Sequence, residues 1–130
     1  FGTMMDGGAT SLFECLETEC VGRPRERGTA SFNHPMHAGF AYFLYRCVAG
    51  IRPLTPGFGE FEIRPDHFDG IPSADVTYET PYGTVAVSFV RRGRETVYSF
   101  RVPVNTTCRF RAGGRSEVYG SGSYTVTVTE

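Results

Sequence analysis

The sequence predicts an α+β chain in which a helical N-terminal part is followed by an antiparallel β-sandwich. The pattern changes near residue 53, from helical or irregular before it to strands and turns after it. The first part holds one stretch with apolar residues at three- and four-residue spacing, and the second part alternates apolar and polar residues over short runs. The 16 glycines and 8 prolines suit a turn-rich β region.

The predicted helix covers residues 34–49. Asn33 is a good N-cap, and Pro35 falls in the first turn, where its missing N–H costs nothing. Gly50 follows as a C-cap and Pro53 blocks continuation. One face carries an apolar stripe made of Met36, Phe40, Phe43, Leu44, Cys47 and Val48.

The opposite face of this helix carries Tyr42, Tyr45 and Arg46, so the helix is expected to contact protein on more than one side. One helix cannot bury its own stripe, and the β region that follows holds only about 70 residues. The first part therefore has the pattern of the end of a larger helical domain. We place the domains at residues 1–52 and 53–130.

Residues 51–59, IRPLTPGFG, are predicted to be a loop that separates the two parts. Short strands with period-two alternation follow, with turn signals such as Pro81-Tyr82-Gly83 between them. The basic segment Arg91-Arg92-Gly93-Arg94 is interpreted as a solvated hairpin tip. The predicted strands cover residues 61–64, 75–80, 84–90, 95–104, 107–111, 116–119 and 123–129.

Charge and hydropathy exclude several classes of protein. The net charge is −1, with 13 basic and 14 acidic residues, so no nucleic-acid or membrane partner is expected. No stretch approaches the roughly 20 apolar residues of a membrane helix, and no signal-peptide pattern is visible. The chain begins at Phe1, so the start was processed or the chain is a piece of something longer. These features leave the compartment open.

The four cysteines, Cys15, Cys20, Cys47 and Cys108, allow three disulfide pairings. They include no C-x-x-C pair, so no zinc site is expected, and four free thiols in a reducing compartment are the favoured interpretation. Cys47 lies in the apolar helical run and is predicted to be a buried thiol.

Two segments hold the candidate site residues. In GATSLFE, residues 8–14, Glu14 lies among Leu12, Phe13 and Leu16, and a carboxylate in apolar company has a raised pKa or a specific role. A surface glutamate on a short helix is the alternative. The neighbouring acids, including Glu17, are interpreted as solvated residues or caps.

In SFNHPMHAGF, residues 31–40, His34 and His37 lie near the predicted helix start. Two histidines without a third ligand at useful spacing do not predict a metal site. A capping or packing role is the alternative to a histidine that projects into a pocket and donates to a sugar hydroxyl.

Taken together, these segments resemble the C-terminal end of bacterial α-L-rhamnosidases of glycoside hydrolase family 78. GATSLFE resembles a signature near the end of that family's (α/α)6 barrel, and SFNHPMHAGFAYFLYRCVAGI resembles its S-x-N-H segment and following helix. PGFGEFEIRP resembles the link into the C-terminal β-domain. VTYETPYGTVAVSF, VPVNTTCRF and EVYGSGSYTV resemble successive strands of that domain.

The resemblance implies an inverting hydrolysis of terminal α-L-rhamnosides by two carboxylates about 6.5–9.5 Å apart. It implies that Glu14 is the general base and that His34 lines the sugar subsite. Phe13 is the second substrate-binding residue predicted, and its ring can pack beside the sugar or the core. The general acid would lie in an earlier barrel segment that is absent here, so the isolated chain is expected to be inactive. No cofactor and no metal are implied.

The sequence departs from the family pattern at several positions. Phe13 stands where the family usually has Trp, and Ser11 where it has Thr, which puts the identity of the sugar in doubt more than the fold. The implied partners are a rhamnose-containing glycoside or oligosaccharide and the remainder of the barrel, with a homo-oligomer possible. The rival hypothesis is a non-catalytic β-sandwich module that binds carbohydrate or a partner chain.

Overall fold

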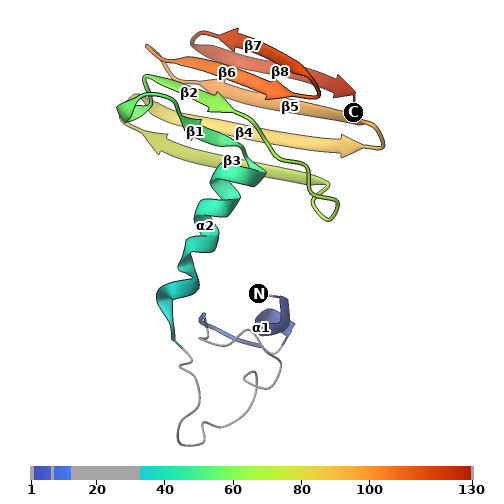
Figure 1. Ribbon diagram of the computed structural model, residues 1–130. Coiled ribbons are helices and arrows are strands. Elements are labelled where there is room, and N and C mark those ends of the chain that lie inside the picture. The colour runs from blue at the N-terminus through green and yellow to red at the C-terminus, as the bar shows by residue number, and fades with distance from the viewer. Residues whose placement is uncertain (1, 7, 13–32, 130) are drawn as a thin grey trace, which may run out of the picture. The chain divides into compact units, whose positions relative to one another are not determined.

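The computed structural model describes residues 2–6, 8–12 and 33–129 of the 130-residue chain (Figure 1). The chain divides into two compact units, Phe1–Ala41 and Tyr42–Glu130, and each is described by itself. Phe13 and Glu14, the predicted substrate contact and base, lie outside the described residues.

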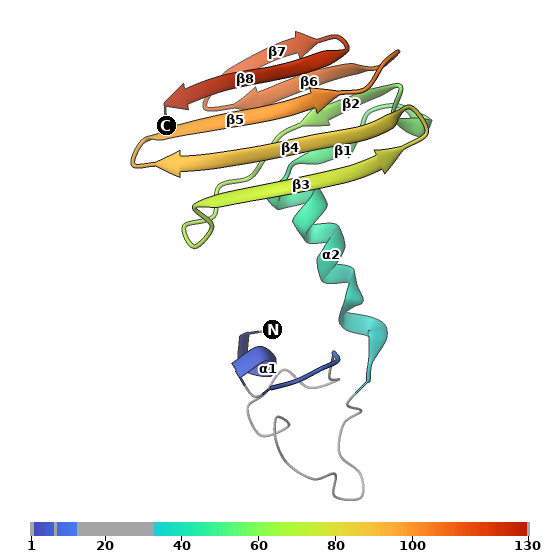
Figure 2. The ribbon, with the colours of Figure 1, turned by 180° about the vertical axis from the view of Figure 1, so that it is seen from behind.

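The second unit is a β-sandwich of two four-stranded sheets, as the sequence predicts (Figures 1 and 2). The first sheet, in spatial order, holds β1 (Ile51–Pro53), β2 (Glu60–Ile63), β6 (Thr107–Ala112) and β7 (Arg115–Tyr119). The second sheet holds β3 (Ser73–Thr80), β4 (Gly83–Arg92), β5 (Glu95–Val102) and β8 (Gly122–Thr129).

Two details of the first sheet differ from the sequence prediction. All neighbouring strands are antiparallel except β2 and β6, which are parallel, because β3, β4 and β5 are built in the other sheet before the chain returns. β1 lies within residues predicted as loop. It is a three-residue edge strand paired only with β2, and an edge position tolerates Pro53, which has no N–H to donate.

The core lies between the two sheets and is rich in aromatic rings. Alternate residues of β4 and β5 point inward, which gives the buried Val85, Val87 and Phe89 and the buried Tyr98 and Phe100. The ring of Phe100 stacks on that of Phe110 from β6, with centroids 5.1 Å apart and planes 7° apart. The period-two pattern therefore sets the two faces of these strands, and aromatic pairs join the sheets.

The helical segment has the predicted extent but an irregular backbone. It consists of the 3-10 helix η2 (Pro35–Gly39), the α-helix α2 (Phe40–Phe43) and the π-helix η3 (Leu44–Val48). Two other short helices are α1 (Gly2–Asp6) and the 3-10 turn η4 (Pro56–Phe58). The helix predicted over residues 34–49 is therefore present as one helical run, with α-helical geometry over Phe40–Phe43 alone. No helix in the described part of the chain is long and apolar enough to cross a membrane.

The end of the helical segment closes one open side of the sandwich. Val48 and Ala49 are buried in the core, and the ring of Tyr45 lies 5.4 Å from that of Tyr78 on β3. The N–H of Asp66 donates to the carbonyl oxygen of Cys47 at 2.8 Å. η3 is therefore packed as part of the sandwich.

Gly50 makes the turn from η3 into β1 possible. Its φ is +74°, and its carbonyl oxygen accepts a 2.9 Å hydrogen bond from the N–H of Arg64. A Cβ at Gly50 would lie 2.1 Å from the carbonyl carbon of Arg64. The predicted C-cap is therefore a position where both the backbone conformation and the close approach of another segment require glycine.

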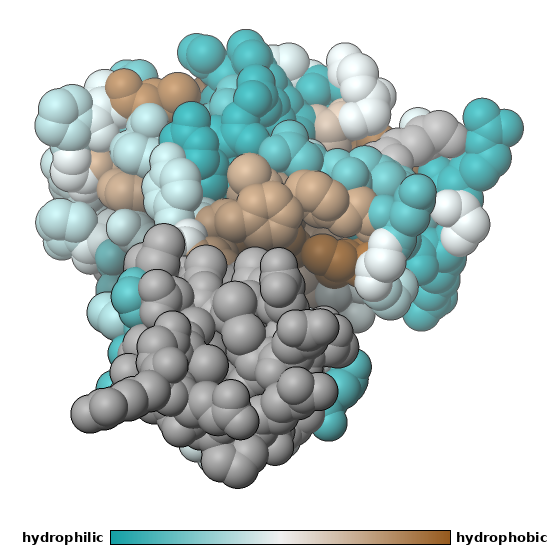
Figure 3. All heavy atoms as spheres, turned by 60° about the horizontal axis from the view of Figure 1, so that its bottom comes forward, coloured by the Kyte–Doolittle hydropathy of each residue, from teal (hydrophilic) through white to brown (hydrophobic). Residues whose placement is uncertain are grey.

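The side chains at the start of this unit remain exposed although they are large and apolar. Tyr42 is 63% exposed, and Phe43 and Leu44 are each 42% exposed. In Figure 3, hydrophobic residues gather near the middle of the face that is turned toward the viewer. Exposed apolar groups of this kind mark interaction surfaces, ligand-binding grooves or aggregation-prone sites.

Candidate functional site

The GATSLFE segment begins directly after a short capped helix. The N–H of Gly8 donates to the carbonyl oxygen of Met5 at 3.0 Å, and that of Ala9 donates to Met4 at 2.9 Å. Gly8 has a φ of +72°, which glycine adopts without strain. Met4 is buried, and the two backbone hydrogen bonds hold the start of GATSLFE at the end of α1.

The structure brings the two candidate segments together through the backbone. The N–H of His34 donates to the carbonyl oxygen of Leu12 at 2.7 Å. Leu12 directly precedes Phe13 and Glu14 in the sequence. The histidine side chain is half-buried and stands directly before η2. Of the three residues predicted for the site, His34 is the one within the described residues, and it lies beside the segment that leads to the other two.

Metal-binding side chains do not gather in the described part of the chain, since no group of three His, Cys, Asp or Glu side chains is close enough to hold an ion there. Cys47 and Cys108 are free thiols. Cys47 is half-buried, so its prediction as a buried thiol was wrong: the helix end packs on the sandwich on one side only. Cys108 on β6 is fully buried, and burial raises the pKa of its thiol to about 12.

A second candidate site lies on the outer face of the second sheet, and sequence reasoning missed it. Strand register places Asp75, Ser88, Ser99 and Thr125 in one row across β3, β4, β5 and β8. The next row holds Thr77, Ala86, Arg101 and Ser123. Alternation along each strand could have marked these residues as outward, but the register that aligns them was not predictable from one strand at a time.

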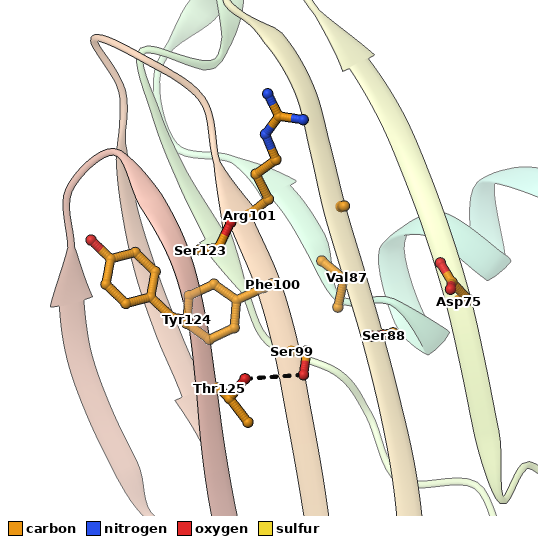
Figure 4. Close-up of a pocket in the computed structure, with 10 residues that line it drawn as sticks. Asp75, Val87, Ser88, Ser99, Phe100, Arg101, Ser123, Tyr124 and Thr125 are labelled. Carbon is orange, nitrogen blue, oxygen red and sulfur yellow. Dashed lines mark hydrogen bonds between the residues drawn. The ribbon is translucent and has the colours of Figure 1, made fainter.

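All residues of these rows except Thr77, together with Val87, Phe100 and Tyr124, line a shallow hollow of about 320 Å³, which we call the outer-face hollow (Figure 4). Its polar side chains are those of Asp75, Ser88, Ser99, Arg101, Ser123 and Thr125. The hydroxyls of Ser99 and Thr125 lie 3.3 Å apart in a hydrogen bond. The side chains of Ala86, Ser88 and Ser99 are small, so the surface is recessed at the centre of the hollow. Asp75 and Arg101 come from β3 and β5, the strands on either side of β4.

Comparison with known proteins gives a consistent result. The family profile described as "Bacterial alpha-L-rhamnosidase C-terminal domain" matches residues 50–123, more than half of the chain. An "Alpha-L-rhamnosidase" of Formosa agariphila is 30% identical over 83 residues, which cover 62% of this chain and 9% of that protein. One from Streptomyces avermitilis is 29% identical over 108 residues, which cover 82% of this chain and 10% of that protein.

Solved structures agree with the fold. The crystal structure of Streptomyces avermitilis α-L-rhamnosidase complexed with L-rhamnose matches with a TM-score of 0.79 and 26% identity, over 96% of this chain and 14% of that chain. Native α-L-rhamnosidase from Aspergillus terreus gives a TM-score of 0.86 at 22% identity, over 96% of this chain and 15% of that chain, and supports the fold alone.

The curated relatives extend well beyond the matched region, since this chain spans about a tenth of their length. The profile match begins at Gly50, where η3 ends and the sandwich strands begin, and ends at Ser123 in β8. It therefore covers β1 to β7 in full and the first two residues of β8. On this evidence, the chain belongs to the bacterial α-L-rhamnosidase C-terminal domain family.

Proposed function

We propose that the chain is the C-terminal part of an inverting, α-L-rhamnosidase-like glycoside hydrolase that acts on terminal α-L-rhamnosides. In this proposal residues 1–52 supply the last helices of an (α/α)6 catalytic barrel, and residues 53–130 form the domain after it. The family match over residues 50–123 is the observation that carries the proposal. The named relatives extend the similarity over 62% and 82% of the chain.

Glu14 is the proposed general base. An inverting base must be ionised and must hold a water on the face of the sugar opposite the leaving group. The carboxylate takes a proton from this water as its oxygen attacks the anomeric carbon. The glycosidic oxygen leaves with a proton from a general acid, which this proposal assigns to a barrel segment outside residues 1–130.

His34 and Phe13 are the proposed substrate contacts. The 2.7 Å hydrogen bond from His34 N–H to the carbonyl oxygen of Leu12 supports this pairing, because it holds the backbone of His34 against Leu12, which lies two residues before Glu14 in the sequence. A half-buried imidazole at the start of a helical segment can hydrogen-bond a sugar hydroxyl. The ring of Phe13 would pack against the apolar face of the sugar.

The remainder of the barrel is the proposed partner of the exposed helical side chains. Tyr42, Phe43 and Leu44 expose large apolar surfaces next to a helix end that is firmly packed on the sandwich. Upstream barrel helices would cover these side chains in the complete protein. The isolated chain, with one carboxylate of the pair and an uncovered apolar group, should be inactive and prone to self-association.

The test is a hydrolysis screen of the complete protein on a panel of nitrophenyl glycosides that includes the α-L-rhamnoside. The α-L-rhamnoside should be the best substrate, and NMR recorded in the first minutes should show β-L-rhamnose before mutarotation mixes the anomers. The 130-residue chain serves as the control and should release no nitrophenol. Preference for a different glycoside, or initial release of the α-anomer, would contradict the corresponding part of the proposal.

A further inference from the structure

The outer-face hollow presents hydrogen-bond donors and hydrogen-bond acceptors around its recessed centre. Asp75 offers carboxylate oxygens that accept, Arg101 offers N–H groups that donate, and the Ser and Thr hydroxyls can do either. In the described part of the chain, neither Asp75 nor Arg101 takes part in a hydrogen bond or ion pair with another side chain. Both charged groups are exposed and remain available to a ligand.

An apolar strip borders the hollow on one side. Val90 of β4 and Val97 of β5 are paired across the strands in the row next to Ser88 and Ser99. Their side chains are 45% and 37% exposed, which is high for valine in the middle of a sheet. The face therefore combines a polar hollow with a neighbouring apolar edge.

The composition of this face argues against two other kinds of partner. The core of a stable protein interface is depleted of charged residues and enriched in exposed aromatic ones, whereas the hollow is flanked by Asp75 and Arg101. Of its two aromatic lining residues, Phe100 is buried and Tyr124 is half-buried. A nucleic-acid site needs an excess of positive charge, and here one carboxylate offsets one guanidinium. The kind of ligand that this face fits is a neutral molecule with many hydroxyl groups and some apolar C–H surface.

We propose that the outer-face hollow is a saccharide-binding site that takes a neutral sugar ring of a rhamnose-containing glycan. Asp75 accepts hydrogen bonds from ring hydroxyls, Arg101 donates to hydroxyl oxygens, and Val90 and Val97 contact the C–H face or the methyl group of a 6-deoxy sugar. The choice of sugar rests on the proposed function. The hollow lies at the small end of the range of about 300–1,000 Å³ for ligand pockets and is open, so each ring binds weakly.

Weak single sites are best measured with a polymer that presents many rings. The complete protein is run by affinity electrophoresis through native gels with and without a soluble α-L-rhamnan, and the gel without polysaccharide corrects for changes of charge. Asp75→Asn and Arg101→Ala should each weaken retention by about tenfold, as expected for loss of a hydrogen bond to a charged group. Ser88→Leu fills the hollow without changing charge and should have the same effect.

Matched controls lie on the same face at the β4–β5 turn. Arg92 and Glu95 are paired across the strands and point outward, so Arg92→Ala and Glu95→Ala should retain the wild-type mobility shift. Thermal melts establish that each variant is folded. Equal retention of wild type, the three hollow variants and the controls would overturn the proposal.

The same preparations separate this inference from the proposed function. Hydrolysis of the α-L-rhamnoside by the wild-type protein, with retention that no hollow variant alters, refutes the saccharide site alone. Retention that depends on Asp75 and Arg101 in a protein that hydrolyses no rhamnoside refutes the proposed function alone.

Discussion

The guanidinium of Arg91 donates from Nη1 to the carbonyl oxygen of Ile71 at a distance of 2.8 Å. The same guanidinium lies 4.5 Å from the centroid of the Phe89 ring and reaches the carbonyl oxygens of Phe68 and Asp66, each at 3.4 Å. Arg91 was interpreted from the sequence as part of a solvated hairpin tip, and this was wrong. The side chain fixes the loop between β2 and β3 to strand β4.

Arg91→Ala should therefore lower the free energy of unfolding by about 1–3 kcal/mol, because it removes charge-assisted hydrogen bonds and a cation–π contact. Arg92→Ala removes an exposed arginine from the next position and should change stability by less than about 0.5 kcal/mol. Urea unfolding of both variants measures the difference. Equal stabilities would show that the loop does not depend on Arg91.

Much of the fold was predictable because local pattern and tertiary burial agree in the sandwich. The alternation of apolar and polar residues over β4 and β5 predicts strands, and the inward positions of these strands, such as Val87 and Tyr98, are buried. The parallel pairing of β2 with β6 was not predictable, because it depends on which sheet receives the intervening strands. Arg91 and the outer-face hollow were missed for a related reason: their surroundings come from segments distant in sequence.

The candidate site could be predicted from the resemblance to a known family, but not from the amino-acid composition of its segments. A lone glutamate between Leu12 and Leu16 is compatible with a surface position, and Glu14 lies outside the described residues. The contact between Leu12 and His34 joins two segments that are separate in sequence, and neither segment taken alone predicts it. The role of Glu14 thus stays a prediction.

Glycine at position 50 should be much less replaceable than glycine at position 93. Both have a positive φ, +74° and +61°, so alanine at either position costs about 1–2 kcal/mol of backbone strain. A Cβ at Gly93 meets nothing within 4 Å, whereas at Gly50 it would lie 2.1 Å from the carbonyl carbon of Arg64. Gly50→Ala should therefore cost at least about 2 kcal/mol more than Gly93→Ala. Denaturant melts of the two variants compare them directly, and similar losses would argue against the close approach.

The two described thiols should differ strongly in reactivity. Burial raises the pKa of Cys108 from 9.0 in an exposed thiol to about 12, so almost no thiolate is present at pH 8, whereas Cys47 is half-buried. In a Cys15→Ser, Cys20→Ser background, iodoacetamide should label Cys47 in the folded chain and Cys108 only after unfolding. Mass spectrometry of the peptides shows the order, and early labelling of Cys108 would refute the burial argument.

The same shift has a consequence for stability at high pH. The pKa of Cys108 in the folded chain lies above the unfolded value of 9.0. The contribution of its buried thiol to the free energy of unfolding is therefore fully present below pH 9 and is lost as pH rises from 9 toward 12. A Cys108→Ala variant should therefore lose less stability than the parent chain between pH 8 and pH 10. A parallel loss in the two proteins would contradict this expectation.

Glu117 is the acceptor in a group of hydrogen-bonded side chains on β7. Its carboxylate accepts 2.6 Å hydrogen bonds from the hydroxyl of Tyr119 and from Arg115, and these partners lower its pKa, with Tyr119 contributing most. A lowered pKa gives stability that is present above the ordinary carboxyl pKa near 4.5 and is lost as pH falls through the folded value. Glu117→Gln should lower Tm at pH 7 and have a smaller effect at pH 3, because the carboxyl group is protonated to a greater extent at the lower pH. Glu95→Gln is the control, and an equal effect of Glu117→Gln at both pH values would exclude a role for its charge.

The sharpest expectation concerns Glu14 in the complete protein. Glu14→Gln keeps the size of the side chain and removes the oxygen that takes the proton of the attacking water. Loss of a general base typically costs about two orders of magnitude or more in turnover, so kcat should fall by at least that factor with Tm nearly unchanged. His34→Ala should differ, because loss of a sugar contact raises KM together with any fall in rate.

Glu17→Gln is the matched control for Glu14→Gln, since it makes the same chemical change three residues further along the chain. A glutamate that is merely solvated should tolerate the substitution, so Glu17→Gln should keep near-normal turnover and Tm. The three variants are compared on the nitrophenyl α-L-rhamnoside by initial rates over a range of substrate concentrations, alongside thermal melts. Near-normal kcat in Glu14→Gln, with Tm unchanged, would show that another residue activates the water and that the similarity of GATSLFE to a catalytic signature does not extend to the role of its glutamate.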